Sequence, residues 1–378
     1  MSYCLNPHCL QPENPNDVKF CITCGTKLLL KERYRAIQPI GQGGFGRTFL
    51  AVDEDKPSKP YCVIKQFYPQ AQGTNTVQKA IELFNQEAVQ LDELGKHPQI
   101  PELLAYCTQD DRQYLVQEFI NGQNLAHELL NKGTFNENQI RELLNDLLNV
   151  LQFCHNQQVI HRDIKPENII RRSSDNKLVI VDFGAAKSTA GQPVNRTGTS
   201  IGSPEYVAPE QMRGKAIFAS DIYSLGVTCV NLLTGRSPFD SYDTHNAAWV
   251  WRKFLTTSIS NELGKIIDKM IETIPSQRYQ TTTEVLQDLQ SLNPQTSANI
   301  PPTIINKPVK QNIVTSQNSS QLNRVDQELQ EVKTQFTVGK QQPQNPTPKT
   351  SNPLPENNNN NDVIDKELEE VKAKFSGN

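Results

Sequence analysis

Hydrophobic residues change their spacing along this chain, and the change divides it into a β-rich part and a helical part. In the first part, short apolar runs between polar turns predict β-strands at residues 50–52, 61–65 and 114–122. Residues 77–94 instead carry apolar side chains at helical spacing, which predicts one amphipathic helix within this part. Its apolar face consists of Ile81, Phe84, Ala88, Leu91 and Leu94.

The second part of the chain is predominantly helical. Residues 136–156 repeat apolar side chains at helical spacing and predict a long amphipathic helix, and a short apolar run at 178–181 predicts a buried strand. Further helices are predicted at 221–234, 247–255, 263–271 and 283–292. This order of elements indicates an α+β fold with a strand-rich first lobe and a helical second lobe.

Beyond residue 293 the chain is rich in Asn, Gln, Pro, Thr and Ser, and we expect it to be mostly disordered because it cannot bury enough apolar surface. Two related segments interrupt this tail, since the pattern of residues 325–336 recurs at 364–375. Each copy has one apolar stripe at helical spacing on a segment too short to be a stable isolated helix. A duplicated solubilising spacer is one interpretation. We favour a peptide that docks on a partner or pairs with another copy.

The composition limits the class of partner. The formal net charge is −3 over 378 residues, which gives no electrostatic case for binding nucleic acid or acidic lipid. No apolar run approaches the roughly 20 residues of a membrane span, and the first residues lack a charged leader followed by an apolar stretch. We therefore expect a cytoplasmic protein whose cysteines are kept reduced.

Four of the eight cysteines lie close to the start of the chain. Two of them form a C-x-x-C turn followed by Gly25, which can adopt the positive φ that points backbone N–H groups at thiolates. A segment this small needs a staple, and we favour a zinc-ribbon-like site of four thiolates around Zn²⁺. Redox sensing by the same thiols stays open, and His8 is a weaker ligand candidate than its neighbour Cys9. The predicted ligands are Cys4, Cys9, Cys21 and Cys24, whereas the others are predicted to be buried, unreactive thiols (Cys62, Cys107, Cys154 and Cys229).

The run HRDIKPEN at residues 161–168 places a carboxylate, an ammonium and an amide on one short loop. Asp163 can accept the proton of an attacking hydroxyl, Lys165 can stabilise a phosphoryl group in transfer, and Asn168 can bind a metal through its amide oxygen. Asp182, in a D-F-G turn, supplies a second carboxylate. This combination predicts phosphoryl transfer.

A glycine-rich turn at 41–46 precedes this loop in the sequence. Its glycines at i, i+2 and i+5 leave little side-chain bulk, so its backbone can approach phosphates closely. A dinucleotide-binding turn shares the pattern but opens a helix, whereas here a strand follows and Lys65 ends the next strand. Glu87 lies beside the apolar face of the helix 77–94. We favour an ion pair that holds Lys65 on a phosphate over an ordinary exposed glutamate.

Together these features resemble the eukaryotic-type serine/threonine protein kinases over about residues 31–292. The four cysteines, followed by this segment and a polar tail, resemble the cyanobacterial kinases with an N-terminal four-cysteine motif. The resemblance implies a bilobal protein kinase fold at 31–292, with a zinc-ribbon-like module at 1–30 and the disordered tail at 293–378. The motifs that carry it are the glycine-rich turn, Lys65, Glu87, the run 161–168, Asp182-Phe183-Gly184 and Ala208-Pro209-Glu210.

The resemblance also implies an activity, the transfer of the ATP γ-phosphate to serine and threonine hydroxyls of protein substrates in signal transduction. Asp163 would be the catalytic base, and Lys165 would stabilise the transferring phosphate and mark serine/threonine specificity. Asn168 and Asp182 would bind Mg²⁺ or Mn²⁺. The remaining residues of the implied nucleotide site are Ile40, Gly41, Gln42, Gly43, Gly44, Phe45, Gly46, Thr48, Val63, Lys65, Glu87, Glu118 and Phe119.

Further contacts around the catalytic loop follow from the same resemblance. Asp221 would brace the loop, and Ser203 would contact both of its charged residues. A phosphate on Thr199, added by autophosphorylation, would pair with Arg162 and Lys187 and order the segment that carries it.

Two other functions compete with this one. A catalytically silent scaffold usually lacks the lysine, the loop aspartate or the metal-binding aspartate, but Lys65, Asp163 and Asp182 are all present. A small-molecule kinase of the same fold is disfavoured by the Ala-Pro-Glu motif and by the long segment 182–210.

Overall fold

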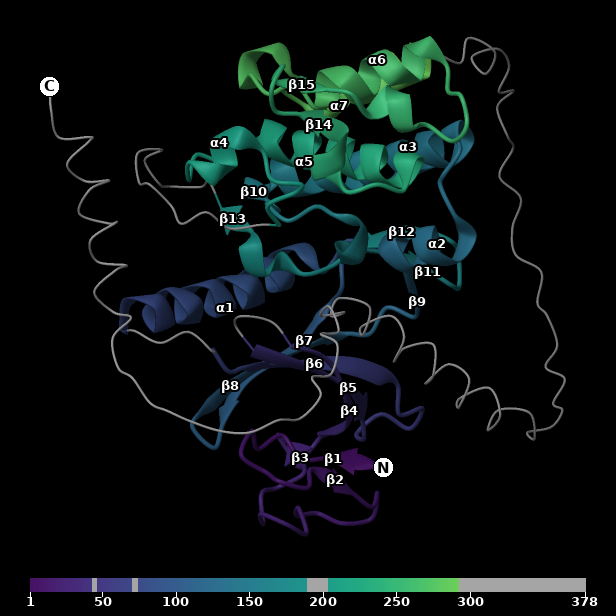
Figure 1. Ribbon diagram of the computed structural model, residues 1–378. Helices are drawn as coiled ribbons and strands as arrows, with labels where there is room; N and C mark the ends of the chain where they lie inside the picture. The colour runs from purple at the N-terminus through teal and green to yellow at the C-terminus, as the bar shows by residue number, and fades with distance from the viewer. Residues whose placement is uncertain (43–45, 70–73, 189–202, 292–378) are drawn as a thin grey trace, which may run out of the picture. The chain divides into compact units, whose positions relative to one another are not determined.

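The computed structural model describes residues 1–42, 46–69, 74–188 and 203–291 (Figure 1). Along the chain the strand-rich lobe precedes the helical lobe, as the hydrophobic spacing predicts. Residues 43–45, Thr199 and both tail repeats lie outside the described residues. The expected disorder of the tail therefore stays a prediction.

A six-stranded antiparallel sheet and one long helix form the first lobe. In sheet order the strands are β3 (Leu29–Leu30), β4 (Tyr34–Gln42), β5 (Gly46–Asp53), β6 (Tyr61–Phe67), β8 (Arg112–Glu118) and β7 (Leu103–Gln109). The helix α1 (Thr74–Leu94) begins at Thr74 instead of the predicted residue 77. Because β3 belongs to this sheet, the end of the predicted module 1–30 is continuous with the first lobe.

The strands alternate their side chains between two faces of the sheet. Phe49 and Ile64 point to one face, where they form an apolar cluster with Leu5 of the N-terminal segment. Leu50 and Val63 point to the other face and form a separate cluster. The N-terminal segment therefore covers one face of the sheet and leaves the other available to a cleft.

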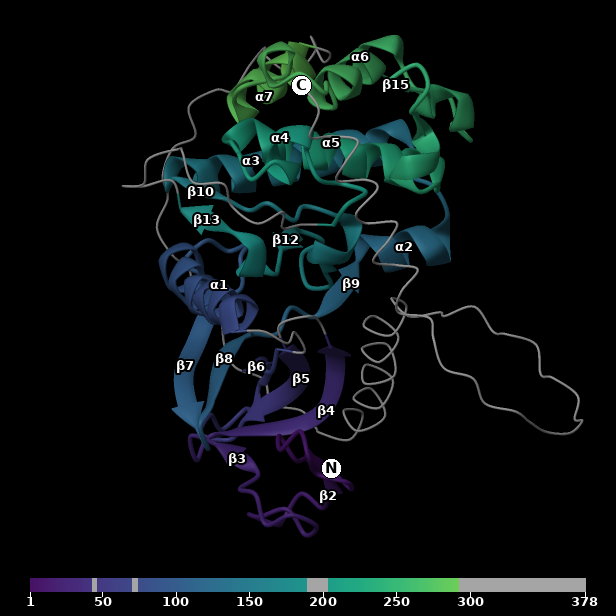
Figure 2. The same cartoon turned by 60° about the vertical axis from the view of Figure 1, so that its left-hand side comes forward.

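The N-terminal four-cysteine segment has a small apolar core of its own and depends on the sheet. Its short strands β1 (Ser2–Tyr3) and β2 (Glu13–Asn14) pair antiparallel. Arg35 of β4 donates to the hydroxyl of Ser2 over 3.2 Å and to the carbonyl of Val18 over 3.1 Å. Figures 1 and 2 show the segment, in purple, beside β3 and β4.

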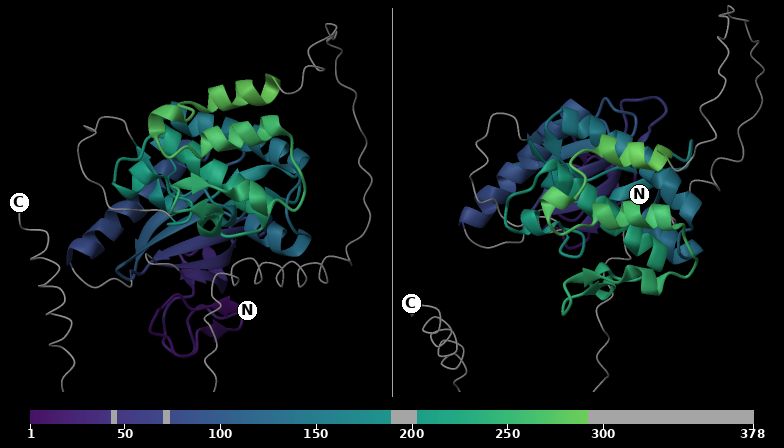
Figure 3. Two further views of the ribbon diagram at one scale, coloured as in Figure 1. Left: turned by 45° about the horizontal axis from the view of Figure 1, so that its top comes forward. Right: turned by 90° about the horizontal axis from the view of Figure 1, so that it is seen from above.

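Helices dominate the second lobe, where α3, α5, α6 and α7 pack on one another (Figure 3). The long helix α3 starts with a capping box, in which Asn136 and Gln139 bond each other's backbone. The helix α5 is buried along nearly its whole length. The helices of this lobe are α2 (Leu125–Lys132), α3 (Glu137–Asn156), α4 (Pro209–Met212), α5 (Phe218–Thr234), α6 (Asn261–Met270) and α7 (Thr282–Ser291).

Two small sheets between these layers position the predicted loop residues. Asn168 directly precedes β11 and Asp182 follows β12, and these strands are antiparallel neighbours, so the two residues meet at one end. The Val181 N–H donates to the Asn168 carbonyl over 2.9 Å. The strands are β9 (Gly122–Asn124), β11 (Ile169–Arg172) and β12 (Leu178–Ile180) in one sheet, and β10 (Val159–Ile160) and β13 (Lys187–Ser188) in the other.

The prediction of a helix at residues 247–255 is wrong. That segment forms β15 (Ala248–Trp249), paired with β14 (Tyr242–Asp243), and then one 3₁₀ turn (Trp251–Phe254). The ring N–H of Trp249 donates to the Ile271 carbonyl, which directly follows α6. The ring N–H of Trp251 donates to Asp268 of α6. Side chains two positions apart point the same way in extended backbone but not in a helix, so these tertiary contacts override the helical pattern.

A buried ion pair joins α4 to the segment before α7. The guanidinium of Arg278, whose side chain is fully buried, donates to Glu210 over 2.8 Å and to the Ala219 carbonyl over 2.9 Å. Burial raises the pKa of Glu210, but bonds from Arg278 and Ser220 outweigh burial and hold the pKa below its usual value. Ionised Glu210 therefore depends on its partner.

We expect Arg278→Met to lower the free energy of unfolding by about 3–5 kcal/mol, because it leaves a carboxylate buried without its cation. Urea denaturation measures the change. The pair's contribution should be present above the unfolded-state pKa of Glu210 and should be lost as pH falls through the depressed folded-state pKa. Lys177→Met, which removes an exposed ion pair with Asp146, is the control and should cost at most about 1 kcal/mol. Equal losses in the two variants would contradict the prediction.

Candidate active site

A cleft with a cavity of about 390 Å³ lies between the sheet and the second lobe. All predicted nucleotide-site residues that the structure describes line this cleft, and so does Asn168. Apolar residues that the motifs did not single out also line it, namely Phe84, Ile120, Ile170 and Val181. The sequence carries no separate signal for them, because strand and helix residues of this kind are indistinguishable from core.

Lys65 lies between two carboxylates in the cleft. Its ammonium donates to Glu87 and, over 3.1 Å, to Asp182. Burial alone would lower the pKa of Lys65, but the charges of Asp182 and Glu87 raise it. Lys65 in turn holds the pKa of Asp182 at about 2. The expected Lys65–Glu87 ion pair is confirmed, and the cleft holds a fixed cation beside an ionised carboxylate.

The loop 161–168 is held by Asp221, a fully buried residue of α5. Its carboxylate accepts the backbone N–H of His161 over 2.9 Å and of Arg162 over 2.8 Å, and His155 Nε2 lies 2.9 Å away. Burial would raise the pKa of Asp221, but these partners, His155 first, lower it. The structure therefore confirms that Asp221 braces this loop.

Asp163 and Lys165 hold a serine hydroxyl between them. Lys165 Nζ lies 3.0 Å from Asp163 Oδ2 and donates to the Ser203 hydroxyl over 2.6 Å. The same hydroxyl donates to Asp163 Oδ1 over 3.1 Å. The predicted contacts of Ser203 are thereby confirmed, and the loop can orient an alcohol against a carboxylate.

Asn168 and Asp182 suit a divalent cation beside this loop. The Asn168 side-chain nitrogen donates to the carbonyl and to Oδ2 of Asp163, both over 2.8 Å, which directs the amide oxygen away from Asp163. Asp182 is ionised and reaches the same cleft. Amide and carboxylate oxygens are the ligands that Mg²⁺ and Mn²⁺ prefer, so these residues fit the predicted metal.

Of the predicted contact between Arg162 and a phosphate on Thr199, only the Arg162 side lies within the described residues. Arg162 is buried, and within the described residues its Nε has no hydrogen-bond partner. Burial lowers the pKa of its guanidinium. Thr199 and the side chain of Lys187 lie outside the description.

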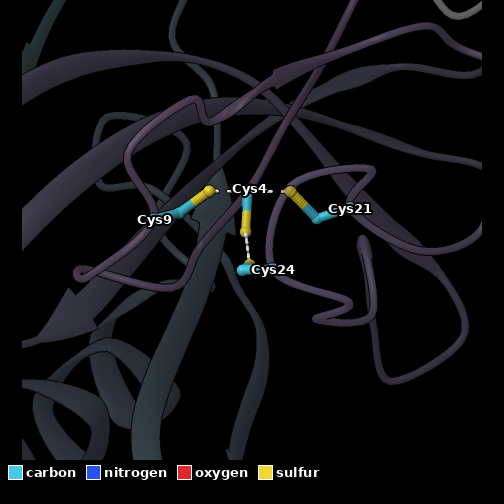
Figure 4. Close-up of side chains that lie close together, drawn as sticks. All are labelled: Cys4, Cys9, Cys21 and Cys24. Atoms are coloured by element: carbon cyan, nitrogen blue, oxygen red, sulfur yellow. Dashed lines mark hydrogen bonds between the residues drawn. The ribbon is translucent and has the colours of Figure 1, made fainter.

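The four N-terminal cysteines gather in one cluster (Figure 4). Their sulfurs all lie within 4.8 Å of one another, with 3.5 Å between Cys4 and Cys24 and 3.6 Å between Cys9 and Cys21. Thiolates at about 2.3 Å from a tetrahedral zinc ion would be about 3.8 Å apart, so the arrangement fits this metal. The cluster does not include His8.

Backbone amides support the sulfurs of this cluster. Four amides that lie against a sulfur and lower its pKa come two residues after a cysteine, at Asn6, Gln11, Thr23 and Thr26, and the amide of Cys24 does the same for Cys21. For Cys24, burial raises the pKa, but the hydroxyl and amide of Thr26 outweigh it and give a pKa of about 6. A thiolate is the form that binds metal. The remaining cysteines are buried and unpaired, as predicted, and burial raises the pKa of each (Cys62, Cys107, Cys154 and Cys229).

The fold and the cleft together define a protein kinase domain. A comparison with family models agrees, because the model described as protein kinase domain matches residues 34–289. The chain belongs to this family. Among the described residues, no helix is both long enough and apolar enough to cross a membrane.

Several named kinases are similar to this chain. It is 42% identical over 299 residues to serine/threonine-protein kinase B of Synechocystis sp., which covers 77% of this chain and 52% of the relative. It is 43% identical over 269 residues to serine/threonine-protein kinase C of the same organism, covering 69% and 50%. Serine/threonine-protein kinase PknA of Nostoc sp. is 40% identical over 269 residues, covering 69% and 48%. The chain thus spans about half the length of the curated relatives it matches.

We expect the purified full-length protein to contain one Zn²⁺ per chain, and Cys24→Ser to release it. Structural zinc sites bind with about 10–16 kcal/mol, so the loss of one ligand of four should lower the affinity about a hundredfold or more. Metal analysis and competition with a chromogenic chelator measure this. Cys107→Ser, which changes a cysteine outside the cluster, should keep the metal. A wild-type protein without stoichiometric metal would favour the redox interpretation.

Proposed function

We propose that this protein is a serine/threonine protein kinase that transfers the ATP γ-phosphate to hydroxyl groups of protein substrates. The observation that carries the proposal is the serine hydroxyl held between Asp163 and Lys165, beside a cleft in which Lys65 is ion-paired. This geometry suits an alcohol nucleophile and a phosphate donor at adjoining positions. The family membership and the names of the relatives support it.

The cleft residues would divide the work of binding ATP. Gly41 and Gly46 offer backbone without side-chain bulk for the phosphates, and Lys65, held by Glu87, would neutralise them. Adenine would lie against the apolar residues of the cleft, near the backbone of Glu118 and Phe119. Mg²⁺ or Mn²⁺ supplies charge neutralisation between the phosphates when it is bound.

Phosphoryl transfer itself requires little covalent chemistry from the protein. Asn168 would hold the metal together with Asp182. Asp163 would orient the attacking hydroxyl and accept its proton, and Lys165 would stabilise the charge on the phosphate in transfer. Lys165 already donates to a hydroxyl over 2.6 Å, so its ammonium lies within hydrogen-bond reach of an alcohol oxygen beside Asp163.

The four-cysteine cluster would hold structural Zn²⁺, the tail repeats would dock on a protein partner, and the protein would act in the cytoplasm on protein substrates. A silent scaffold is disfavoured because the ion pair and both aspartates are in place. Neither nucleic acid nor a membrane is a proposed partner.

We expect Asp163→Asn to lower kcat about 10²–10⁴-fold, the range for loss of a general base. The affinity for ATP should not change, because Asp163 does not line the nucleotide cleft. Transfer of label from ATP to the protein and to a serine peptide measures kcat. Calorimetry measures the affinity for ATP. Asp175→Asn, which changes an exposed turn carboxylate, is the control. Equal labelling of wild type and Asp163→Asn would overturn the catalytic assignment.

Thr199→Ala should lower the kcat of a preparation preincubated with ATP by about tenfold or more, since one charge-assisted hydrogen bond contributes about 1.5–3 kcal/mol. This expectation is motivated by the buried Nε of Arg162, which has no hydrogen-bond partner among the described residues. Peptide phosphorylation before and after phosphatase treatment measures it, with Thr197→Ala as the control. Unchanged activity in the preincubated Thr199→Ala protein would exclude this switch.

A further inference from the structure

The N-terminal segment contacts the sheet through the backbone carbonyl of Leu5, the residue next to the metal-ligand candidate Cys4. The Leu5 side chain is buried in the apolar cluster of the sheet. Its carbonyl accepts hydrogen bonds from Arg47 Nη2 over 2.9 Å and from Gln66 Nε2 over 2.8 Å. One carbonyl therefore joins the cysteine cluster to two strands of the kinase sheet.

Arg47 and Gln66 form a closed pair across those two strands. They are register partners in β5 and β6, and Arg47 donates to Gln66 Oε1 through Nε over 3.1 Å and through Nη2 over 2.8 Å. Gln66 is fully buried and also donates to the Tyr114 hydroxyl over 3.0 Å. Neither side chain can move without breaking a bond to the other or to Leu5.

The next register pair along β5 and β6 is Thr48 with Lys65. Because successive side chains alternate between faces, Arg47 and Gln66 point towards the cysteine segment whereas Thr48 and Lys65 point into the cleft. The nucleotide-binding lysine is thus one peptide bond away from Gln66.

Gly46 brings the glycine-rich turn into the same contact. A Cβ atom on Gly46 would lie only 2.0 Å from the backbone carbonyl oxygen of Gln66, so the strand that ends the turn passes directly over Gln66. Gln66 therefore contacts the end of the glycine-rich turn through its backbone, and its side chain is hydrogen-bonded to the cysteine segment.

Arg47 is a partly buried cation at this contact. Within the described residues it forms no ion pair with a carboxylate, and its acceptors are the neutral oxygens of Leu5 and Gln66. Its guanidinium lies over the rings of Phe49 at 5.1 Å and Tyr68 at 5.7 Å. Partial burial disfavours a cation that lacks a carboxylate partner, and it lowers the pKa of the Arg47 guanidinium. Four thiolates around one Zn²⁺ carry a net negative charge, and that charge would compensate Arg47.

We propose that Arg47 is a positioning residue that couples metal binding at the four cysteines to nucleotide binding in the cleft. The proposal rests on the proposed function, since it takes the cluster to hold a metal and the cleft to hold ATP. With metal bound, Cys4 and Leu5 are fixed, and the Leu5 carbonyl holds Arg47 and Gln66 in place. Without metal the carbonyl loses its anchor, and Gly46 and Lys65 lose the support of their strands.

The test compares full-length protein loaded with Zn²⁺ and protein stripped by a chelator that is then dialysed away. Calorimetric titration with Mg²⁺ and a non-hydrolysable ATP analogue should give about tenfold weaker binding to the stripped protein, within the usual range of coupling between sites. Coupling is reciprocal, so the saturating analogue should raise the affinity for Zn²⁺ by the same factor. A purely structural role of Arg47 would not produce that second effect.

Arg47→Met should bind Zn²⁺ stoichiometrically but show the same nucleotide affinity with and without it. Arg47→Lys, which keeps the charge and a donor, should retain most of the coupling. Arg35→Met is the matched control, because Arg35 also donates to two groups of the N-terminal segment but is paired with Val52, away from the cleft. It should keep the tenfold difference.

Equal nucleotide affinities of loaded and stripped wild type, or full coupling in Arg47→Met, would overturn the proposal, and so would a wild-type protein that binds no Zn²⁺. If Arg47→Met does not fold, Gln66→Leu, which removes the other donor to Leu5, must abolish the coupling instead. These outcomes are separate from the proposed function. Phosphate transfer without coupling defeats only the inference, and coupling without phosphate transfer defeats only the kinase assignment.

Discussion

The buried carboxylate of Asp221 is the constraint on which the catalytic loop depends. A charge removed from water must be compensated by hydrogen bonds, and the backbone N–H groups of His161 and Arg162 provide them. Arg162 has a positive φ of 72°, a conformation that costs a residue other than glycine about 1–3 kcal/mol. The bonds to Asp221 stabilise this strained turn, and the turn aims Asp163 at the Ser203 hydroxyl. The backbone of this loop is thereby held in place by a residue of the buried helix α5.

Charge organises the other wall of the cleft. Lys65 is partly buried, and it stays protonated because the charges of Asp182 and Glu87 offset the loss of water. The three groups come from β6, α1 and the turn after β12. They can meet only when the sheet, the helix and that turn are correctly positioned against one another. This arrangement keeps a cation and a carboxylate ready before any ligand arrives, and such preorganisation lowers the cost of binding.

Motifs whose spacing is set by chemistry allowed much of the site to be predicted from the sequence. The ion pair of Lys65 and Glu87 is of this kind, whereas the serine contact of Asp163 was implied by the resemblance to protein kinases. Features that arise from tertiary packing could not be predicted. Ile170 lines the cleft although its strand resembles ordinary core, and the tryptophans of 247–255 override a helical pattern through contacts with α6. No local pattern links Leu5 to a strand some forty residues later.

The apolar cluster that Leu5 shares with Phe49 and Ile64 makes the cysteine segment part of the core of the first lobe. The family match begins at residue 34, yet one face of the sheet is completed by residues before that point. A kinase segment transferred without its cysteine segment would uncover an apolar patch, which invites association with other chains. The sheet therefore requires the cysteine segment to keep this face covered.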